Sequence, residues 1–260
     1  MRAPPTVVLA ALFTCVGVLP AAAPAAPDRD RVWHPHVRAA KQYVRSRAGD
    51  VSFAVRTPGR FAGYRANHAT SSASVVKAML MVAYLNQEGV RGRELDDEDR
   101  ALLDPMIRRS SNKAANQVYG IVGSDGLYRL ARRVGMRNFT TMSVWGGSQI
   151  TAADQTKFFL WIERYVVARH RETALRLLGS VVGYQRWGIA QVRPKGWALY
   201  FKGGWTPVVQ NQVGLYRRGD RRVAIAVLTY GSLNKYGRET ERGVALRLLR
   251  GLGPDSALAE

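Results

Sequence analysis

The sequence predicts a mixed α/β fold of the α+β type, in which an antiparallel sheet built from both ends of the chain carries an inserted helical lobe. Three observations support this prediction. Alternating strand patterns occur at residues 51–64 and again at 199–229, the residues between them are mostly helical in pattern, and a helix flanks the strands at each end. With 260 residues, 47% of them hydrophobic, the chain can bury the core of one large domain.

The first 26 residues have the order of a secretory signal peptide. Arg2 provides a positive start, residues 7–19 are apolar, and small residues follow at 21–26. The apolar part is too short for a permanent membrane helix, so we expect no transmembrane segment in the mature chain. We therefore predict a signal peptide at 1–26 and an exported domain at 27–260, secreted or held in the cell envelope. Acylation of Cys15, the only cysteine, is the less favoured alternative.

The chain is strongly basic, with 39 Lys and Arg residues against 19 Asp and Glu and a net charge of +20. The positive residues are dispersed and form no tract of five or six. This pattern fits either an ordinary solvated surface or a weak attraction to anionic cell-envelope polymers. We expect no nucleic-acid partner for an exported protein. With one cysteine, and with His34 and His36 interpreted as surface residues, we expect no metal and no cofactor.

The first elements predicted are a helix at 34–47, a strand at 51–55 and a return strand at 60–64. The helix has apolar residues at helical spacing, and the two strands are joined by the turn-forming pair Pro58-Gly59.

The helical lobe is expected over about 72–197. Residues 75–85 are almost continuously apolar, which indicates a buried helix. Further helix starts are predicted where capping residues precede apolar faces, at Asp96, Asp104-Pro105, Ser124 and Thr151-Asp154. Gly135 is expected to end the helix that begins at Ser124.

The chain then returns to strand patterns at 199–202, 212–216 and 223–229, with a hairpin turn at 218–220 and a closing helix at 237–249. A sheet and a helical lobe assembled in this way enclose a cleft, where we expect the functional site.

The chemistry of the site rests on a serine and a lysine. No histidine lies in a recognisable hydrolase motif, but Ser-x-x-Lys occurs three times, at Ser74/Lys77, Ser110/Lys113 and Ser232/Lys235. Only Ser74 opens a strongly apolar helix, where burial would favour the neutral, basic form of Lys77. On this evidence alone, an ordinary helix cap is the favoured interpretation of Ser74.

Three motifs in order resemble one family. Ser74-Val75-Val76-Lys77, Ser110-Ser111-Asn112 and Lys202-Gly203-Gly204 resemble the S-x-x-K, S-D-N and K-T-G motifs of the penicillin-recognising serine hydrolases, nearest to class A β-lactamases. The resemblance covers nearly the whole mature chain and implies a β-lactamase/transpeptidase-like fold.

The resemblance implies three catalytic residues. Ser74 corresponds to the acylated nucleophile, Lys77 to the base that activates it, and Ser110 to the proton relay to the leaving nitrogen.

Four further residues are implied to bind the substrate, a β-lactam or a peptidoglycan-like amide. Asn112 would bind the substrate amide, and Lys202 would support Ser110 and attract a carboxylate. Gly204 would keep the strand clear of the substrate. The backbone N–H groups of Trp205 and Ser74 would form the oxyanion hole.

The chain also departs from the family pattern. Ser111 replaces the motif aspartate, Gly203 replaces a hydroxyl residue, and Gln210-Asn211 stands where an arginine and an asparagine are common. Residues 139–149, which correspond to the loop with the water-activating glutamate, contain no carboxylate. We interpret Asp154 as a helix cap and Glu163 as part of a surface ion pair. Acylation is therefore expected to be followed by slow deacylation.

Three functions remain open from the sequence. The first is a β-lactamase-like serine hydrolase. The second is a penicillin-binding peptidase, amidase or esterase of the cell envelope. The third is a catalytically weak envelope-binding protein with the same fold.

Overall fold

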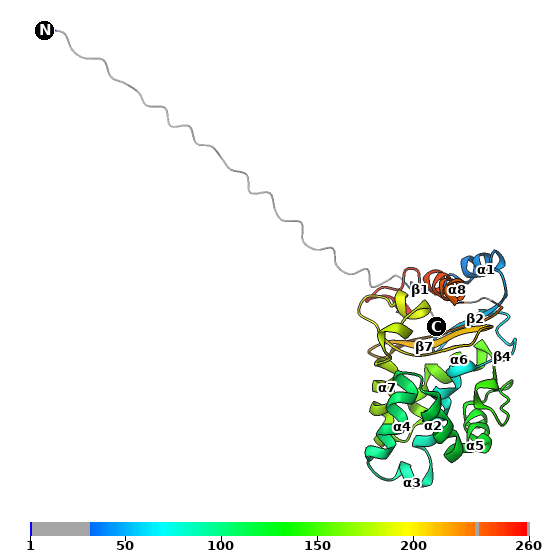
Figure 1. The fold of residues 1–260 in the computed structure, drawn as a ribbon. Coiled ribbons are helices and arrows are strands. Elements are labelled where there is room, and N and C mark those ends of the chain that lie inside the picture. The colour runs from blue at the N-terminus through cyan, green and yellow to red at the C-terminus, as the bar shows by residue number, and fades with distance from the viewer. Residues whose placement is uncertain (2–31, 232–233, 259–260) are drawn as a thin grey trace.

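The structure is a computed structural model that describes Met1, residues 32–231 and residues 234–258 (Figure 1). The predicted signal peptide and Ser232 lie outside the described residues.

A five-stranded antiparallel sheet forms the centre of the domain and confirms the predicted fold class. The strand order is β3-β2-β8-β7-β6, so the strands do come from both ends of the chain. Their bounds are β2 (Asp50–Arg56), β3 (Phe61–Tyr64), β6 (Ala198–Trp205), β7 (Val209–Arg218) and β8 (Arg221–Tyr230). The predicted hairpin turn joins β7 to β8, where Gly219 has a φ of 56° that suits glycine.

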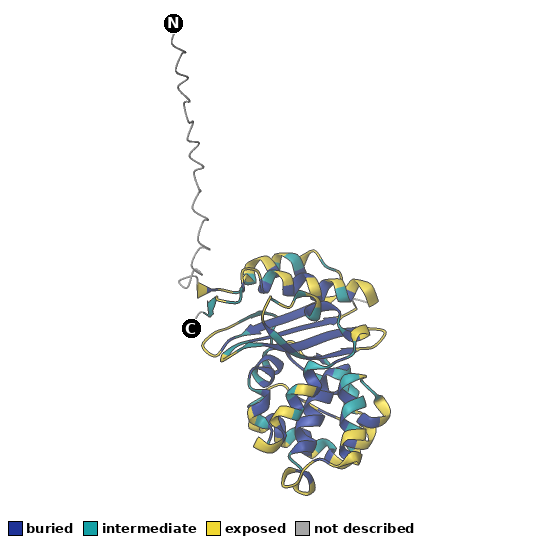
Figure 2. Cartoon of the chain, turned by 90° about the vertical axis from the view of Figure 1, so that its left-hand side faces the viewer, coloured by how far each residue is buried: buried dark blue, intermediate teal, exposed yellow. Residues whose placement is uncertain are grey.

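Both faces of this sheet are covered by helices, which gives the domain two hydrophobic cores (Figures 1 and 2). In β8, Val223, Ile225 and Val227 pack beneath α1 (Val37–Arg45) and α8 (Asn234–Leu248). The alternate residues Ala224, Ala226 and Leu228 join the core of the helical lobe. The lobe consists of α2 (Lys77–Leu85), α3 (Glu88–Arg91), α4 (Asp97–Arg108), α5 (Asn112–Val134), α6 (Ala152–Leu160) and α7 (Arg171–Gly179).

Short elements tie the connections together. The parallel pair β1 (Val32–Trp33) and β9 (Ala257–Leu258) joins the two ends of the described chain, and β4 (Thr70–Ser71) pairs with β5 (Gln149–Ile150). The 3₁₀ turns of the described residues are η1 (Ala73–Val76), η2 (Trp145–Gly147), η3 (Ile162–Tyr165), η4 (Ala168–His170), η5 (Gly183–Gln185) and η6 (Gly188–Val192). No helix within the described ranges is both long and apolar enough to cross a bilayer.

One predicted helix start is wrong. Asp104-Pro105 does not begin a helix, because α4 already begins at Asp97 with Asp96 as its cap. Asp96 and Asp99 form a reciprocal capping box, and the helix continues through Pro105 while Asp104 pairs with Arg108. By contrast, Ser124 does follow a break: α5 bends at Gly123, where φ is 64°, before it ends at Gly135 as predicted.

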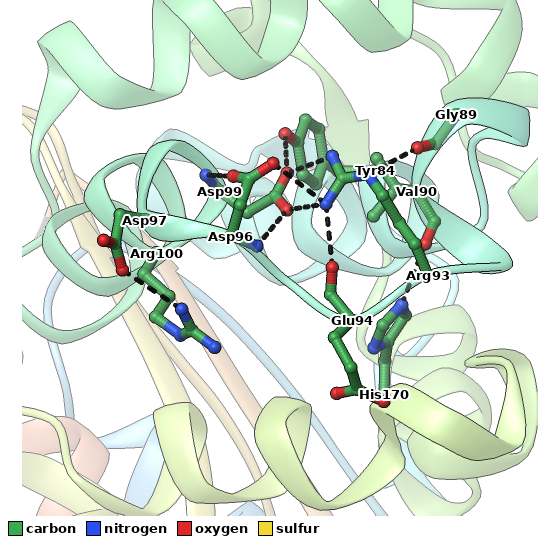
Figure 3. Close-up of polar contacts among 10 residues, drawn as sticks. All are labelled: Tyr84, Gly89, Val90, Arg93, Glu94, Asp96, Asp97, Asp99, Arg100 and His170. Atoms are coloured by element: carbon green, nitrogen blue, oxygen red, sulfur yellow. Dashed lines mark hydrogen bonds and ion pairs between the residues drawn. The ribbon is translucent and has the colours of Figure 1, made fainter.

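A polar cluster fixes the connection between α2 and α4 (Figure 3). The buried Asp99 carboxylate accepts hydrogen bonds from Tyr84 Oη at 2.6 Å and from Arg93 Nη1 at 2.5 Å. Burial raises the pKa of Asp99, but the hydrogen bonds from Arg93 and Tyr84 outweigh it and lower the pKa to about 2. The cluster therefore stabilises this end of the lobe as a charged network.

Candidate active site

A cavity of about 340 Å³ opens where the sheet meets the helical lobe. The η1 turn, the start of α5, the η2 loop and the end of β6 contribute to its wall. Its lining residues are Ala73, Ser74, Asn112, Asn116, Val144, Trp145, Gly146, Trp205 and Thr206. Three of the sequence-predicted site residues, Ser74, Asn112 and Trp205, therefore share one cavity.

Ser74 lies on a tight turn pressed against β6. Ala73, which precedes it, has a φ of 45°, a strained conformation for a residue other than glycine. A Cβ added to Gly204 would lie 2.6 Å from the Ser74 nitrogen and 2.8 Å from the Ser72 carbonyl oxygen. The protein's own backbone therefore already requires a glycine here, whether or not a side chain would also crowd the substrate as predicted.

Lys77 is fully buried and connects the first two motifs. Its Nζ donates to the Ser110 carbonyl at 2.6 Å, to the Ser110 hydroxyl at 3.2 Å and to Asn112 Oδ1 at 2.7 Å. Burial lowers the pKa of Lys77 to about 7, so about half of the amines are neutral at pH 7. No hydrogen bond joins Lys77 to the hydroxyl of Ser74, although both residues are described.

Ser110 lies between two lysines. Its φ of 59° makes it a second strained residue at the site. Its hydroxyl oxygen accepts from Lys77 Nζ at 3.2 Å and from Lys202 Nζ at 3.0 Å. Because both lone pairs are then engaged by amines, the hydroxyl proton is left to be donated elsewhere.

Lys202 is buried beneath the cavity. It donates to the Ser110 hydroxyl and, at 2.8 Å, to the Gly203 carbonyl. Burial, and next the charge of Lys77, lower its pKa well below the ordinary value. Its contacts fit the predicted support of Ser110, whereas its complete burial leaves no surface for a substrate carboxylate in this conformation.

Comparisons with known proteins show the family and the fold of this chain. The family model described as the β-lactamase enzyme family matches residues 98–250, which is more than half of the chain. The chain belongs to the β-lactamase enzyme family. No curated protein matches the sequence.

Solved structures of the same fold include class A β-lactamases. The β-lactamase of Sphaerobacter thermophilus superposes with a TM-score of 0.73 at 19% identity, covering 82% of this chain and 96% of that one. The class A β-lactamase of Mycobacterium abscessus gives 0.71 at 17% identity, with 84% and 99% covered. A point mutant of PBP-A, solved as an acyl-enzyme complex with penicillin G, gives 0.64 at 16% identity, with 80% and 93% covered.

The departures from the β-lactamase motifs have structural explanations. A Cβ at Gly203 would lie 3.3 Å from Trp187 Cζ2, so an indole fills the space on that side of β6. Trp187 also meets the ring of Trp205 edge to face, at 5.1 Å between centroids. The glycine and the tryptophan are thus fitted to one another, and Trp187 supports the cavity wall from behind.

Ser111 is a departure that serves the fold. Gln210, which stands where an arginine is common, is buried, and its neighbour Asn211, which matches the family pattern, also has a structural role. Ser111 caps α5, since its hydroxyl accepts from the Ala114 N–H. Asn211 is buried and donates to the Ser71 carbonyl at 2.8 Å, which ties β7 to the strand before Ser74. Neither side chain lines the cavity.

The loop at 139–149 lies against the Ser74 turn and brings no carboxylate to it. The Ser72 N–H donates to the Ser148 carbonyl at 2.7 Å, and the Ser71 hydroxyl donates to the Gly146 carbonyl. The Trp145 ring centroid lies 4.7 Å from Lys77 Nζ, and its indole N–H donates to Asn116 Oδ1. An indole therefore covers Lys77 on the side of this loop.

The two acidic residues that follow this loop in the sequence and were considered above, Asp154 and Glu163, have structural partners. The predicted cap role of Asp154 is wrong, because Thr151 caps α6 and accepts from the Asp154 N–H. The Asp154 carboxylate is still structural, since it accepts from the backbone N–H groups of Arg137 and Asn138. Glu163 does form an ion pair, but with Arg222 of β8, and both side chains are largely buried. The prediction of a surface pair was wrong because a distant strand supplies the partner.

Sequence reasoning missed Trp145 and Trp187, and it gave no role to Asn116, which ends the usual A-A-N continuation of the second motif. Neither tryptophan belongs to a motif. The only signal for Trp145 was the lack of a carboxylate in residues 139–149. Among the described residues, no group of three His, Cys, Asp or Glu side chains is placed to hold a metal ion.

Proposed function

We propose that the chain is an exported serine hydrolase of the β-lactamase type, in which Ser74 forms an acyl-enzyme with a β-lactam or related amide and loses it slowly. The observation that carries the proposal is the buried Lys77, which lies one helical turn after Ser74 and has a pKa of about 7. Its amine donates hydrogen bonds to both Ser110 and Asn112. A buried, neutral amine is the base that such a serine requires.

In the acylation step, neutral Lys77 takes the proton of the Ser74 hydroxyl as its oxygen attacks the substrate carbonyl carbon. To do so, Nζ turns from one of its present acceptors, since catalytic hydrogen bonds often tighten only with substrate bound. The backbone N–H groups of Ser74 and Trp205 stabilise the resulting oxyanion. The C–N bond then breaks, Ser110 gives its proton to the nitrogen, and Lys77 returns a proton to Ser110. A serine ester and a neutral Lys77 remain.

Deacylation needs a water molecule held beside a base. In class A enzymes a loop carboxylate holds it, whereas here Trp145 covers Lys77 and residues 139–149 contain no Asp or Glu. The acyl-enzyme therefore persists, and its hydrolysis depends on groups already used for acylation.

A second function, a penicillin-binding peptidase, amidase or esterase, is favoured by the same loop. The opening of the cavity carries exposed apolar side chains at Val144 and Trp205, which suit a substrate larger than a small antibiotic. In either case the first step is acylation of Ser74. A catalytically weak envelope-binding protein would lack that step.

The test is peptide mapping after incubation with penicillin G. We expect one adduct, on the peptide that contains Ser74. Ser74→Ala should abolish it with an unchanged melting temperature, and Ser232→Ala, in the third Ser-x-x-Lys motif, serves as the matched control. An adduct on Ser110 or Ser232, or no adduct at all, would contradict the proposal.

Export is part of the proposal and rests on the pattern of residues 1–26. The intact mass of the exported protein should correspond to a start near residues 24–27 and lack Cys15. A mature chain that retains residues 1–20, or a diacylglyceryl mass on Cys15, would overturn it.

A further inference from the structure

Two helices on the side of the sheet opposite the helical lobe form a strongly basic surface. In Figure 1, α1 and α8 lie side by side over this face, and they are in contact. We define the basic face as eight Lys and Arg side chains on and beside these helices: Arg38, Lys41, Arg45, Arg47, Lys235, Arg242, Arg247 and Arg250.

Almost no negative charge offsets this face. Residues 31–49 contain no Asp or Glu, and residues 234–250 contain only Glu239 and Glu241. Glu241 is buried, and burial raises its pKa well above the ordinary value, which favours its uncharged form. Glu239 is exposed and lies 4.0 Å from Lys235. Apart from Glu239, the exposed charged side chains of these two helices are therefore positive, unlike those of the helical lobe, where acidic and basic residues are mixed.

The positions of the charges follow the geometry of the helices. Arg38, Lys41 and Arg45 recur at spacings of three and four, so they occupy one side of α1. The exposed positions of α8, including Lys235 and Arg242, follow the same rule. Because both helices turn their apolar sides to the sheet, the charges face outward together.

Aromatic rings hold two of the arginines at the seam between the helices. Arg247 lies 3.9 Å from the ring centroid of Tyr43, and Arg47 lies 3.6 Å from that of Tyr236. Arg47 also donates to Thr240 Oγ1 at 2.9 Å. Side chains fixed in this way lose little conformational entropy when they bind an anion.

The face fits a phosphodiester polymer better than a bilayer. Six of its eight residues are arginine, whose planar guanidinium pairs with two phosphate oxygens at once. A helix that inserts into lipid needs a free apolar side, whereas Val44 of α1 and Val244 and Leu248 of α8 are buried in the core. The large apolar side chains exposed along these helices are Leu246 and Tyr236 alone, so neither helix offers an apolar side to lipid.

We propose that the basic face binds a linear phosphodiester polyanion through its phosphates alone. The face lies across the sheet from the helical lobe, while the Ser74 cavity opens between the sheet and that lobe. Binding there leaves the cavity open, so the polymer tethers the protein without blocking its site. This inference does not depend on acylation of Ser74.

The test compares two triple variants with equal loss of charge. The face variant is Arg38→Gln, Arg45→Gln and Arg242→Gln. The control variant on the helical lobe is Arg91→Gln, Arg129→Gln and Arg132→Gln; all six arginines are exposed. Binding to a fluorescent poly(glycerol phosphate) and to single-stranded DNA with the same number of phosphates is measured by anisotropy from about 50 to about 300 mM salt, a range over which phosphate contacts lose most of their affinity.

We expect the face variant to bind about 100-fold more weakly near 0.1 M salt. The slope of log affinity against log salt concentration should be smaller by about 2, because binding without the three phosphate contacts releases about two fewer counterions. The control should stay within about threefold of the parent. The two polymers should bind with similar affinity, as phosphate-only recognition requires. Equal losses in both variants, no binding at the lowest salt, a clear preference for DNA over the other polymer, or tighter binding to anionic lipid vesicles would each overturn the proposal.

Discussion

The buried Lys77 makes a quantitative prediction about the pH dependence of acylation. Only the neutral amine can accept the Ser74 proton, and burial lowers the pKa of Lys77 from 10.5 to about 7. The acylation rate should therefore rise with pH through about 7 and level off above about 8. Below the midpoint it should fall about tenfold per pH unit, to about 1% of the plateau at pH 5.

The assay is stopped-flow acylation by a fluorescent penicillin between about pH 5 and 9, which spans the expected midpoint. Lys77→Ala should slow the reaction by at least about a hundredfold at the plateau. Lys113→Ala, at the exposed lysine of the second Ser-x-x-Lys motif, should leave the profile unchanged. A rate that still increases about tenfold per unit between pH 7 and 9 would show a lysine with an ordinary pKa, and would refute the assignment of Lys77 as the buried base.

Two further predictions concern packing and a third concerns a buried charge. Gly204→Ala should slow acylation at least about a hundredfold and lower the melting temperature, because the new Cβ meets the Ser74 backbone at 2.6 Å, whereas Gly120→Ala, at an open position, should do neither. Trp187→Leu should weaken penicillin binding about tenfold with an unchanged saturating acylation rate, since Trp187 packs against the Trp205 ring and does not itself line the cavity; a fall in that rate alone would contradict this. Asp99→Asn should cost roughly 1–2 kcal/mol of unfolding free energy at pH 7, after allowing for solvent screening. Because the pKa of Asp99 is lowered to about 2, its contribution is present above pH 4 and lost towards pH 2, so urea melts of parent and variant should converge there.

Much of the fold follows from local patterns in the sequence. The strands of the sheet alternate visibly, and Gly135 and Asp96 mark helix ends with residues that suit those positions. The helix start predicted at Asp104-Pro105 was wrong, because an aspartate followed by a proline is typical of a helix start but α4 begins earlier. The reciprocal cap formed by Asp96 and Asp99 marks that earlier start.

The site could be predicted only as far as its motifs extend. The three motifs lie together, since Ser110 is contacted by both Lys77 and Lys202. The contacts of Trp145 and Trp187 could not be predicted, because they depend on how a loop and a 3₁₀ turn pack against distant elements. The same is true of Glu163, whose partner is far away in the sequence.

The central claim, that Ser74 is acylated and then held, is tested most directly by mixing the pure protein with excess chromogenic cephalosporin. We predict a burst of one product molecule per protein molecule, followed by a slow or undetectable steady state, with the acyl-enzyme visible by intact mass. Fast steady-state hydrolysis without an accumulating acyl-enzyme would contradict the claim, because it would require another residue to hold the hydrolytic water.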